Sequence, residues 1–370
     1  MIRPALAIFA ALALVGAGSA SAHGHHGGHG NRGVVFVQTN EPGGNKIDVF
    51  SRGDDGRLSL AGAYPTGGLG GVAAPGTESD HLASQGSLAL AGETLIAVNA
   101  GSDTVTSFRV HGNRLQIRSL VSSGGQFPAS VAVSGNLVYV LNSGGSGIVS
   151  GFWLRGSRLV PIPGSARSLG LANGDPPNFL TAPGQVGFTP DGRQLLVTTK
   201  ASTSSVDVFQ VGRDGRLPAT PVVNPSATPV PFAFTFGSGR LVDGEAGASS
   251  VTTYAVGAGG TLSDPRSASD GQTALCWILR VGNVYYVSNT GSNDLSSFTV
   301  DPAGTPSLLQ AVAATTNAGP IDLAASGGYL YAETGTNGTV DEFAVNSDGT
   351  LTSIGTVAGL PPGLEGIAAS

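Results

Sequence analysis

The chain contains only two lysines, and one of them, Lys200, lies where a charged side chain could take part in chemistry. Lys200 follows an apolar segment, and Glu245 occupies the equivalent place one repeat later. A lysine ammonium could hold a substrate carboxylate or stabilise an oxyanion, with a nearby carboxylate as general base. The candidate carboxylates are Glu245, Asp322 and Glu365. The alternative is that Lys200 and Glu245 form a structural ion pair, and the residue types leave both interpretations open.

Three further side chains have reactive or stacking chemistry. His81 follows two acidic residues, and a carboxylate beside it could make it a general base; the alternative is a solvated loop histidine. Cys276 has no neighbouring histidine or basic residue to lower its pKa, so we expect it to be buried and inert. Trp277 is either part of the core or a platform on which a ring-shaped ligand stacks.

A repeat along the chain indicates which elements position these residues. An aliphatic residue followed three positions later by an aromatic one recurs seven times, at intervals of 44–45 residues with two longer intervals. The aromatic members are Phe50, Phe108, Phe152, Phe209, Tyr254, Phe298 and Phe343. Each copy is flanked by short apolar segments and glycine-containing turns, which are typical of β-hairpins. Four strands in each repeat predict an all-β, seven-bladed propeller.

The ends of the repeat region predict how the ring closes. The first repeat begins at Val34 with its second strand, and residues 363–370 resemble a first strand with nothing after it. We therefore expect one C-terminal strand to complete the N-terminal blade, which leaves no unpaired sheet edge.

Polar residues at strand ends are expected to converge at the mouth of the central channel. Because neighbouring strands are antiparallel, the start of a first strand and the end of a second strand share one face. Two insertions, at about 65–84 and 163–182, also lead into first strands and should overhang that face. The predicted catalytic residues are Lys200, Glu245, Glu365 and His81, and the predicted substrate-binding residues are Gln85, Ser130, Gln185, Trp277, Asn289 and Asp322. The asparagines could instead cap their own turns.

The N-terminal segment predicts export. Residues 1–22 are typical of a signal peptide, with Arg3, an apolar stretch and the small-residue cleavage site Ala20-Ser21-Ala22. The apolar stretch is too short for a good membrane anchor, and no later segment is long enough. Residues 23–33 form a His/Gly-rich flexible segment that either binds a divalent transition metal or is a spacer. The propeller domain is expected over 34–370.

The composition limits the kinds of partner and cofactor that we expect for this protein. The net charge of −6 and the absence of a basic patch argue against nucleic acid. A single cysteine allows no intrachain disulfide. No zinc-finger or EF-hand spacing occurs, so we expect no cofactor and no metal site in the propeller; the alternative is a Ca²⁺ ion held in the channel by Glu, Asp and Asn oxygens, for which the sequence has no signature. We expect a monomer, secreted outside the cell or into the periplasm, that engages a small-molecule ligand or a cell-surface component.

Several motifs resemble the lactonase-type seven-bladed propellers, which include the phosphogluconolactonase and carboxymuconate cyclase relatives. The most specific pieces are Ala83-Ser-Gln-Gly-Ser87, Asn99-Ala-Gly-Ser-Asp-Thr-Val105, the segment from Ala182 to Gly192, Pro231-Phe-Ala-Phe234 and Asn289-Thr-Gly-Ser. The resemblance implies a propeller enzyme that opens or forms a lactone. Cytoplasmic members carry a Pro-His sequence in the first strand of a central blade, where this chain has Gln185, which cannot act as a base.

Two function classes remain. One is a secreted lactonase-like enzyme with its site at the channel mouth. The other is a non-catalytic extracellular binding or scaffold propeller, because the Val-Asn-Ala-Gly-Ser turns are also similar to those of surface-layer propellers.

Overall fold

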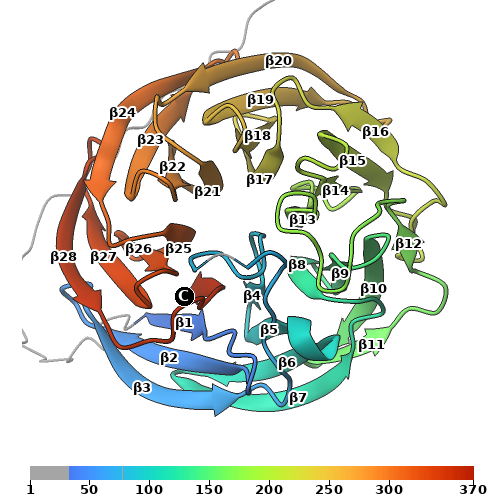
Figure 1. Cartoon of the computed structure of the whole chain (residues 1–370), viewed down its shortest axis with the longest axis horizontal. Coiled ribbons are helices and arrows are strands. Elements are labelled where there is room, and N and C mark those ends of the chain that lie inside the picture. Colours follow the sequence, from blue (N-terminus) through green and yellow to red (C-terminus); the bar gives the residue numbers. More distant parts are fainter. Residues whose placement is uncertain (1–32, 77) are drawn as a thin grey trace, which may run out of the picture. The chain divides into compact units, whose positions relative to one another are not determined.

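A computed structural model describes residues 33–76 and 78–370, and this part of the chain forms a seven-bladed β-propeller (Figure 1). The predicted signal peptide and residues 23–32 of the His/Gly-rich segment lie outside the described residues. Each blade is an antiparallel sheet whose first strand lies at the channel and whose fourth strand lies at the rim. The predicted fold is confirmed.

Blades are numbered here in chain order. Blade 1 contains β29 (Ile367–Ala369), β1 (Val34–Gln38), β2 (Lys46–Arg52) and β3 (Leu58–Pro65). Blade 2 contains β4 (Leu88–Ala91), β5 (Thr94–Asn99), β6 (Thr104–His111) and β7 (Arg114–Ser122), with the short 3-10 helix η1 (Ala100–Ser102) between β5 and β6. Blade 3 contains β8 (Pro128–Ser134), β9 (Leu137–Asn142), β10 (Ile148–Arg155), β11 (Arg158–Pro161) and β12 (Arg167–Ser168), the last two both pairing with β10.

The other four blades follow the regular order. Blade 4 contains β13 (Gln185–Phe188), β14 (Gln194–Thr198), β15 (Ser205–Gln210) and β16 (Val222–Pro225). Blade 5 contains β17 (Pro231–Gly237), β18 (Arg240–Glu245), β19 (Ser250–Val256) and β20 (Leu262–Ser269). Blade 6 contains β21 (Leu275–Val281), β22 (Val284–Asn289), β23 (Asp294–Val300) and β24 (Pro306–Thr315). Blade 7 contains β25 (Pro320–Ser326), β26 (Tyr329–Thr334), β27 (Thr339–Val345) and β28 (Leu351–Val357).

The repeated aromatic residues occupy one structural position. All seven lie in the third strand of their blade and are at most 3% exposed. They pack with apolar residues of neighbouring sheets, so that the core is a series of layers between the blades. Burial of such large side chains supplies much of the free energy that holds one blade against the next.

The C-terminal strand closes the ring as predicted. β29 pairs antiparallel with β1, with Phe36 opposite Ala368, and it becomes the first strand of blade 1. Ser370 adds a further backbone hydrogen bond to the carbonyl of Val34. The first blade therefore combines one C-terminal and three N-terminal strands.

The two insertions meet on one face of the propeller, which we call the insertion face. The first connects β3 to β4, and the second connects β12 to β13. They pair through a parallel bridge between Ala74 and Asn178, and the amide of Phe179 donates to the carbonyl of Ala74 at 3.0 Å. No helix within residues 33–76 and 78–370 is long and apolar enough to cross a membrane.

Candidate functional site

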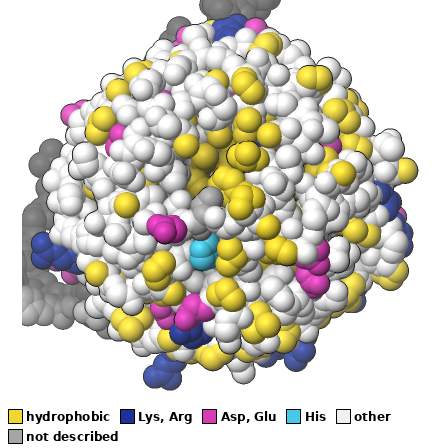
Figure 2. Space-filling view, viewed as in Figure 1, with side chains coloured by type: hydrophobic (Ala, Val, Ile, Leu, Met, Phe, Trp, Pro, Cys, Tyr) yellow, Lys and Arg dark blue, Asp and Glu magenta, His cyan; other side chains and the backbone are white. Residues whose placement is uncertain are grey.

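A pocket of about 450 Å³ opens on the insertion face, between the two insertions and blades 4 to 6. Figure 2 shows hydrophobic side chains gathered in a hollow there, over the inner ends of β13, β17 and β21. The lining residues are Ser79, Asp80, Phe179, Leu180, Lys200, Val230, Phe232, Ala246, Gly247, Ala274, Cys276, Trp277, Thr290 and Gly291. A hollow of this size with a few polar groups is typical of small-molecule sites.

Lys200 lines this pocket and is 2% exposed. Its Nζ donates to the carbonyl oxygens of Ala83 at 2.6 Å and Phe179 at 2.8 Å, one from each insertion. The ammonium also lies over the rings of Phe179 and Phe232, at 5.4 and 5.0 Å from their centroids. Burial lowers the pKa of Lys200 to about 8, while Asp80, Cys276 and Glu365 oppose the shift. An ammonium has three N–H donors, so one remains after the two carbonyls.

The carboxyl groups of Asp80 and Glu365 interact beside the pocket, which lowers the pKa of Asp80 and raises that of Glu365. Two ionised carboxylates have no proton to share, so one of them must be protonated. Burial and the charge of Asp80 raise the pKa of Glu365 well above its ordinary value, which makes Glu365 the proton donor. Burial also raises the pKa of Asp80 to about 6, although the charge of Lys200 lowers it. Asp80 is therefore a carboxylate at neutral pH.

Backbone amides hold this carboxyl pair in place. The amide of Ala83 donates to Asp80 Oδ1 at 2.7 Å, and the amide of Leu82 donates to Glu365 Oε2 at 2.6 Å. Both amides belong to the end of the first insertion, whereas Glu365 immediately precedes β29. The pair therefore joins the insertion to the C-terminal strand.

Two more carboxyls are buried near this pair. Asp322 accepts from the amides of Leu323 at 2.9 Å and Gly86 at 3.4 Å, and Glu333 accepts from the amide of Gly366 at 2.9 Å. Burial raises the pKa of Asp322 to about 7 and that of Glu333 well above its ordinary range. Among the residues that the structure describes, no three histidine, cysteine, aspartate or glutamate side chains are placed to hold a metal ion.

Cys276 and Trp277 form another wall of the pocket. The Trp277 ring is tilted against Phe232 with centroids 4.8 Å apart, and its Nε1 donates to the carbonyl of Ser84 at 3.0 Å. Trp277 is thus a core residue, which was one of the two alternatives, and it also contributes to the pocket lining. Burial raises the pKa of the Cys276 thiol well above its ordinary value, so the thiol is a poor nucleophile, as expected.

Three of the predicted substrate-binding residues bind other parts of the protein. The Gln85 amide exchanges two hydrogen bonds with the backbone of Ile278, across the channel in blade 6. Gln185 accepts from the amide of Phe234 at 2.6 Å, and Ser130 bridges Gln85 and Val186. None of the three lines the pocket, and their hydrogen bonds join neighbouring or opposite blades.

The pairing of Lys200 with Glu245, one of the alternatives raised by the sequence, does not form. Glu245 accepts from the hydroxyls of Ser226 at 2.6 Å, Thr252 at 2.9 Å and Tyr254 at 2.9 Å. These partners all belong to blade 5 or the connection leading into it, away from the Lys200 ammonium. Burial raises the pKa of Glu245 to about 7. The equivalent repeat positions of two blades are thus turned toward different surroundings.

Asn289 and His81 also lie outside the pocket lining. Asn289 donates to Asp294 and Ser296, both at 2.7 Å, within its own blade, consistent with the turn-capping alternative. His81 is half-buried, and its ring lies so close to Gly363 that a Cβ there would be 1.9 Å from it. Burial lowers the pKa of His81.

Asp80 is the functional candidate that the sequence analysis did not select. It lies in an insertion with no counterpart in the other blades, so the repeat gave no register for it. The only available signal was its position directly before His81. The structure brings Asp80, rather than His81, to the Lys200 pocket.

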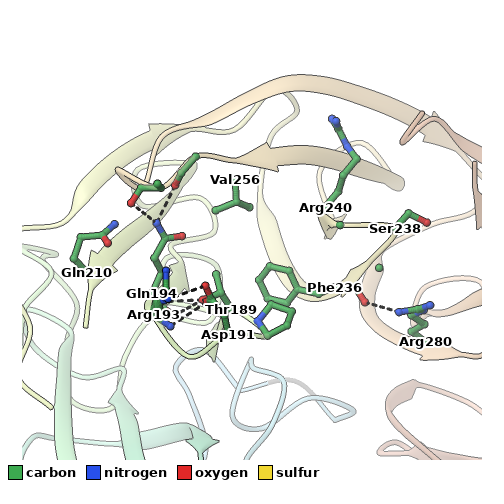
Figure 3. A pocket seen from close by; sticks show the side chains of 15 residues that line it. Thr189, Asp191, Arg193, Gln194, Gln210, Phe236, Ser238, Arg240, Val256 and Arg280 are labelled. Carbon is green, nitrogen blue, oxygen red and sulfur yellow. Dashed lines mark hydrogen bonds and ion pairs between the residues drawn. The ribbon is translucent and has the colours of Figure 1, made fainter. Parts of the chain in front are cut away.

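A larger hollow, of about 760 Å³, lies on the opposite face, between blades 4 and 5. It is lined by the turns that join β13 to β14, β17 to β18 and β19 to β20. Figure 3 shows Arg193 beside Asp191 on one side of Phe236 and Arg280 on the other. Arg280 donates to the Phe236 carbonyl at 3.3 Å, and Arg240 pairs with Asp264 at 3.1 Å. The Arg193 side chain is 84% exposed, and the residues that line this hollow include no carboxyl pair and no lysine.

The buried carboxyls predict an unusual dependence of stability on pH. Their pKa values are raised to about 6 for Asp80 and about 7 for Asp322 and Glu245, so their contribution is complete below about pH 4 and is lost as pH rises through 6–7. We expect Tm to fall by several degrees between about pH 5 and pH 8. Lys200 opposes this fall only at the upper end of the window, because its lowered pKa of about 8 makes stability rise with pH mainly above that value.

Calorimetry of the wild type and Asp322→Asn across this range tests the expectation. The variant should show a shallower pH dependence, because a buried amide does not titrate. A Tm that rises steadily from pH 5 to pH 8 would contradict the assignment of raised carboxyl pKa values.

Fold and site together define a class: a seven-bladed propeller with a ligand-sized pocket between its channel mouth and two joined insertions. A protein from Lactobacillus plantarum is similar at a TM-score of 0.73 and 18% identity, covering 92% of this chain and 99% of that one. A Pseudomonas aeruginosa periplasmic gluconolactonase is similar at a TM-score of 0.69 and 18% identity, covering 91% and 98%. A proposed 6-phosphogluconolactonase from Bacteroides uniformis has a TM-score of 0.69 and 18% identity, covering 92% and 99%.

These similarities establish that the chain shares the fold of lactonase-type propellers. The chain matches no family model and no curated protein.

Proposed function

We propose that the protein is an exported lactonase-like enzyme that opens a lactone in the pocket on the insertion face. The observation that supports this most is the placement of a buried ammonium, Lys200, and a carboxylate, Asp80, in one small pocket. The shared fold with a gluconolactonase adds to it. Export is inferred from residues 1–22.

The two groups have complementary roles in this proposal. The remaining N–H of Lys200 stabilises the negative charge that develops on the lactone carbonyl oxygen. Asp80 takes a proton from the attacking water, and its pair with Glu365 holds the carboxylate in place. The resulting acid returns its proton to the ring oxygen as the carbon–oxygen bond breaks. Water is consumed and a hydroxy acid is released.

The pKa values predict a bell-shaped dependence of activity on pH. Asp80 must be ionised and Lys200 protonated, so kcat/KM should be highest between about pH 6 and pH 8. Asp80→Asn should lower kcat by about 100-fold or more and remove the acidic limb of the profile. Glu365→Gln, which retains a donor toward Asp80, should shift that limb with a smaller loss of kcat.

The matched control is Asp103→Asn, on the same face but outside the Lys200 pocket. It should leave kcat and the profile unchanged. An Asp80→Asn variant with wild-type turnover would exclude the proposed base.

The second candidate function is non-catalytic binding at the cell exterior. It is favoured by the contacts of Lys200, whose two carbonyl bonds and two aromatic neighbours also suit a purely structural role. This candidate expects saturable ligand binding without turnover. Lactone hydrolysis that a pocket substitution abolishes would exclude it.

A further inference from the structure

The pocket wall is mostly apolar. Its apolar side chains come from the second insertion and from blades 5 and 6: Phe179, Leu180, Val230, Phe232, Ala246, Ala274, Cys276 and Trp277. Only two lining residues are charged, Asp80 and Lys200, and none is an arginine. Such a wall stabilises a ligand by removing apolar surface from water.

The single lysine is poorly suited to bind an anion. Its ammonium already donates to two backbone carbonyls and lies over two aromatic rings. The carboxylate of Asp80 lies in the same pocket and offsets its charge. A phosphate dianion needs several charge-assisted donors to replace its hydration, and here it would also meet a buried carboxylate.

The aromatic side chains suit a ring or an alkyl chain. Phe232 and Trp277 pack against each other at a 59° tilt and are 3% and 1% exposed, so the more exposed Phe179 and Leu180 supply more of the accessible apolar surface. Leu180, at the rim, is 61% exposed and extends the apolar wall outward. An apolar substituent on a ligand would cover this exposed leucine.

We propose that the ligand of this pocket is an uncharged lactone with an alkyl or aryl substituent, and that phosphorylated sugar lactones are excluded. The lactone part of this inference rests on the proposed function. The preference for an apolar over an anionic ligand rests on the wall alone.

Binding of three lactones tests the preference independently of turnover. The probes are δ-decalactone, D-glucono-δ-lactone and 6-phosphogluconolactone, followed by Trp277 fluorescence in a Trp153→Phe background. We expect δ-decalactone to bind at least about tenfold more tightly than the phosphorylated lactone. Binding of δ-decalactone without hydrolysis would support this inference and contradict the catalytic proposal. Faster hydrolysis of a sugar lactone than of δ-decalactone would support the catalytic proposal and contradict the preference for an apolar ligand. If no probe binds saturably, the catalytic proposal and the ligand preference are both wrong.

A rim substitution gives a second test with little risk to folding. Leu180→Arg adds a cation to the exposed rim, and we expect it to improve binding of 6-phosphogluconolactone by about tenfold and to weaken binding of δ-decalactone. Leu69→Arg is the matched control, since Leu69 is 41% exposed and lines a separate hollow. Equal effects of the two substitutions, or no effect of Leu180→Arg, would overturn the assignment of this pocket.

Discussion

Replacing Lys200 by methionine is expected to lower lactone hydrolysis by about 100-fold or more, because it removes the donor proposed for the oxyanion. Methionine retains most of the side-chain volume without the charge. The substitution also leaves the carbonyls of Ala83 and Phe179 without the Nζ donor. Each buried carbonyl left unpaired costs about 1–3 kcal/mol, while removal of a desolvated ammonium recovers part of that cost.

The structural and catalytic effects of this substitution are separable. Loss of the shared donor should increase amide hydrogen exchange where the insertions pair, at Ala74 and Phe179, whereas the blades should remain protected. Lys46→Met is the matched control, because Lys46 is 40% exposed and pairs at the surface with Glu41. Lys200→Met with wild-type kcat would exclude a catalytic role, and unchanged exchange would exclude the role in joining the insertions.

Deleting residues 367–370 is expected to have the largest effect on stability. The deletion removes β29 and exposes the edge of β1, whose five residues are all buried. The lost backbone hydrogen bonds, at about 1 kcal/mol each, together with burial of Ile367, amount to several kcal/mol. This is comparable with the total stability of many proteins, so we expect a fall in Tm of more than about 10 °C or an insoluble protein.

A circular permutation provides the control for this deletion. Moving residues 363–370 to a position directly before Val34, through a flexible linker, keeps the strand but changes its connection. The permuted protein should regain cooperative unfolding near the wild-type Tm, because the pairing with β1 is restored. A truncated protein that unfolds at the wild-type temperature would show that closure contributes little.

The propeller was predictable because its signals are local and repeated. Phe50 and its six counterparts mark the third strand of every blade, and burial of that position requires a large apolar residue each time. Closure was predictable for a related reason, since Val34 begins a repeat that lacks the strand supplied by residues 363–370.

The site was only partly predictable. Strand-end positions correctly placed Lys200 and Trp277 on the face with the insertions, where both line the pocket. The same rule also selected Gln85 and Gln185, whose amides bind the backbones of other blades. The position of a residue in the repeat predicts how far along the channel axis it lies. The residues packed around it determine which way its side chain points.

Lys200 shows which features of the site are predictable from the sequence and which depend on the tertiary structure. The residue pattern alone predicts that one of two lysines lies at the end of a second strand, on the face that carries both insertions. The packing of the insertions determines that its partners are two insertion carbonyls and that Asp80, not Glu245, is the carboxylate of its pocket. The insertions lack the periodicity that gives every other segment its register. Their path therefore depends on contacts between residues about one hundred positions apart, which no local pattern records.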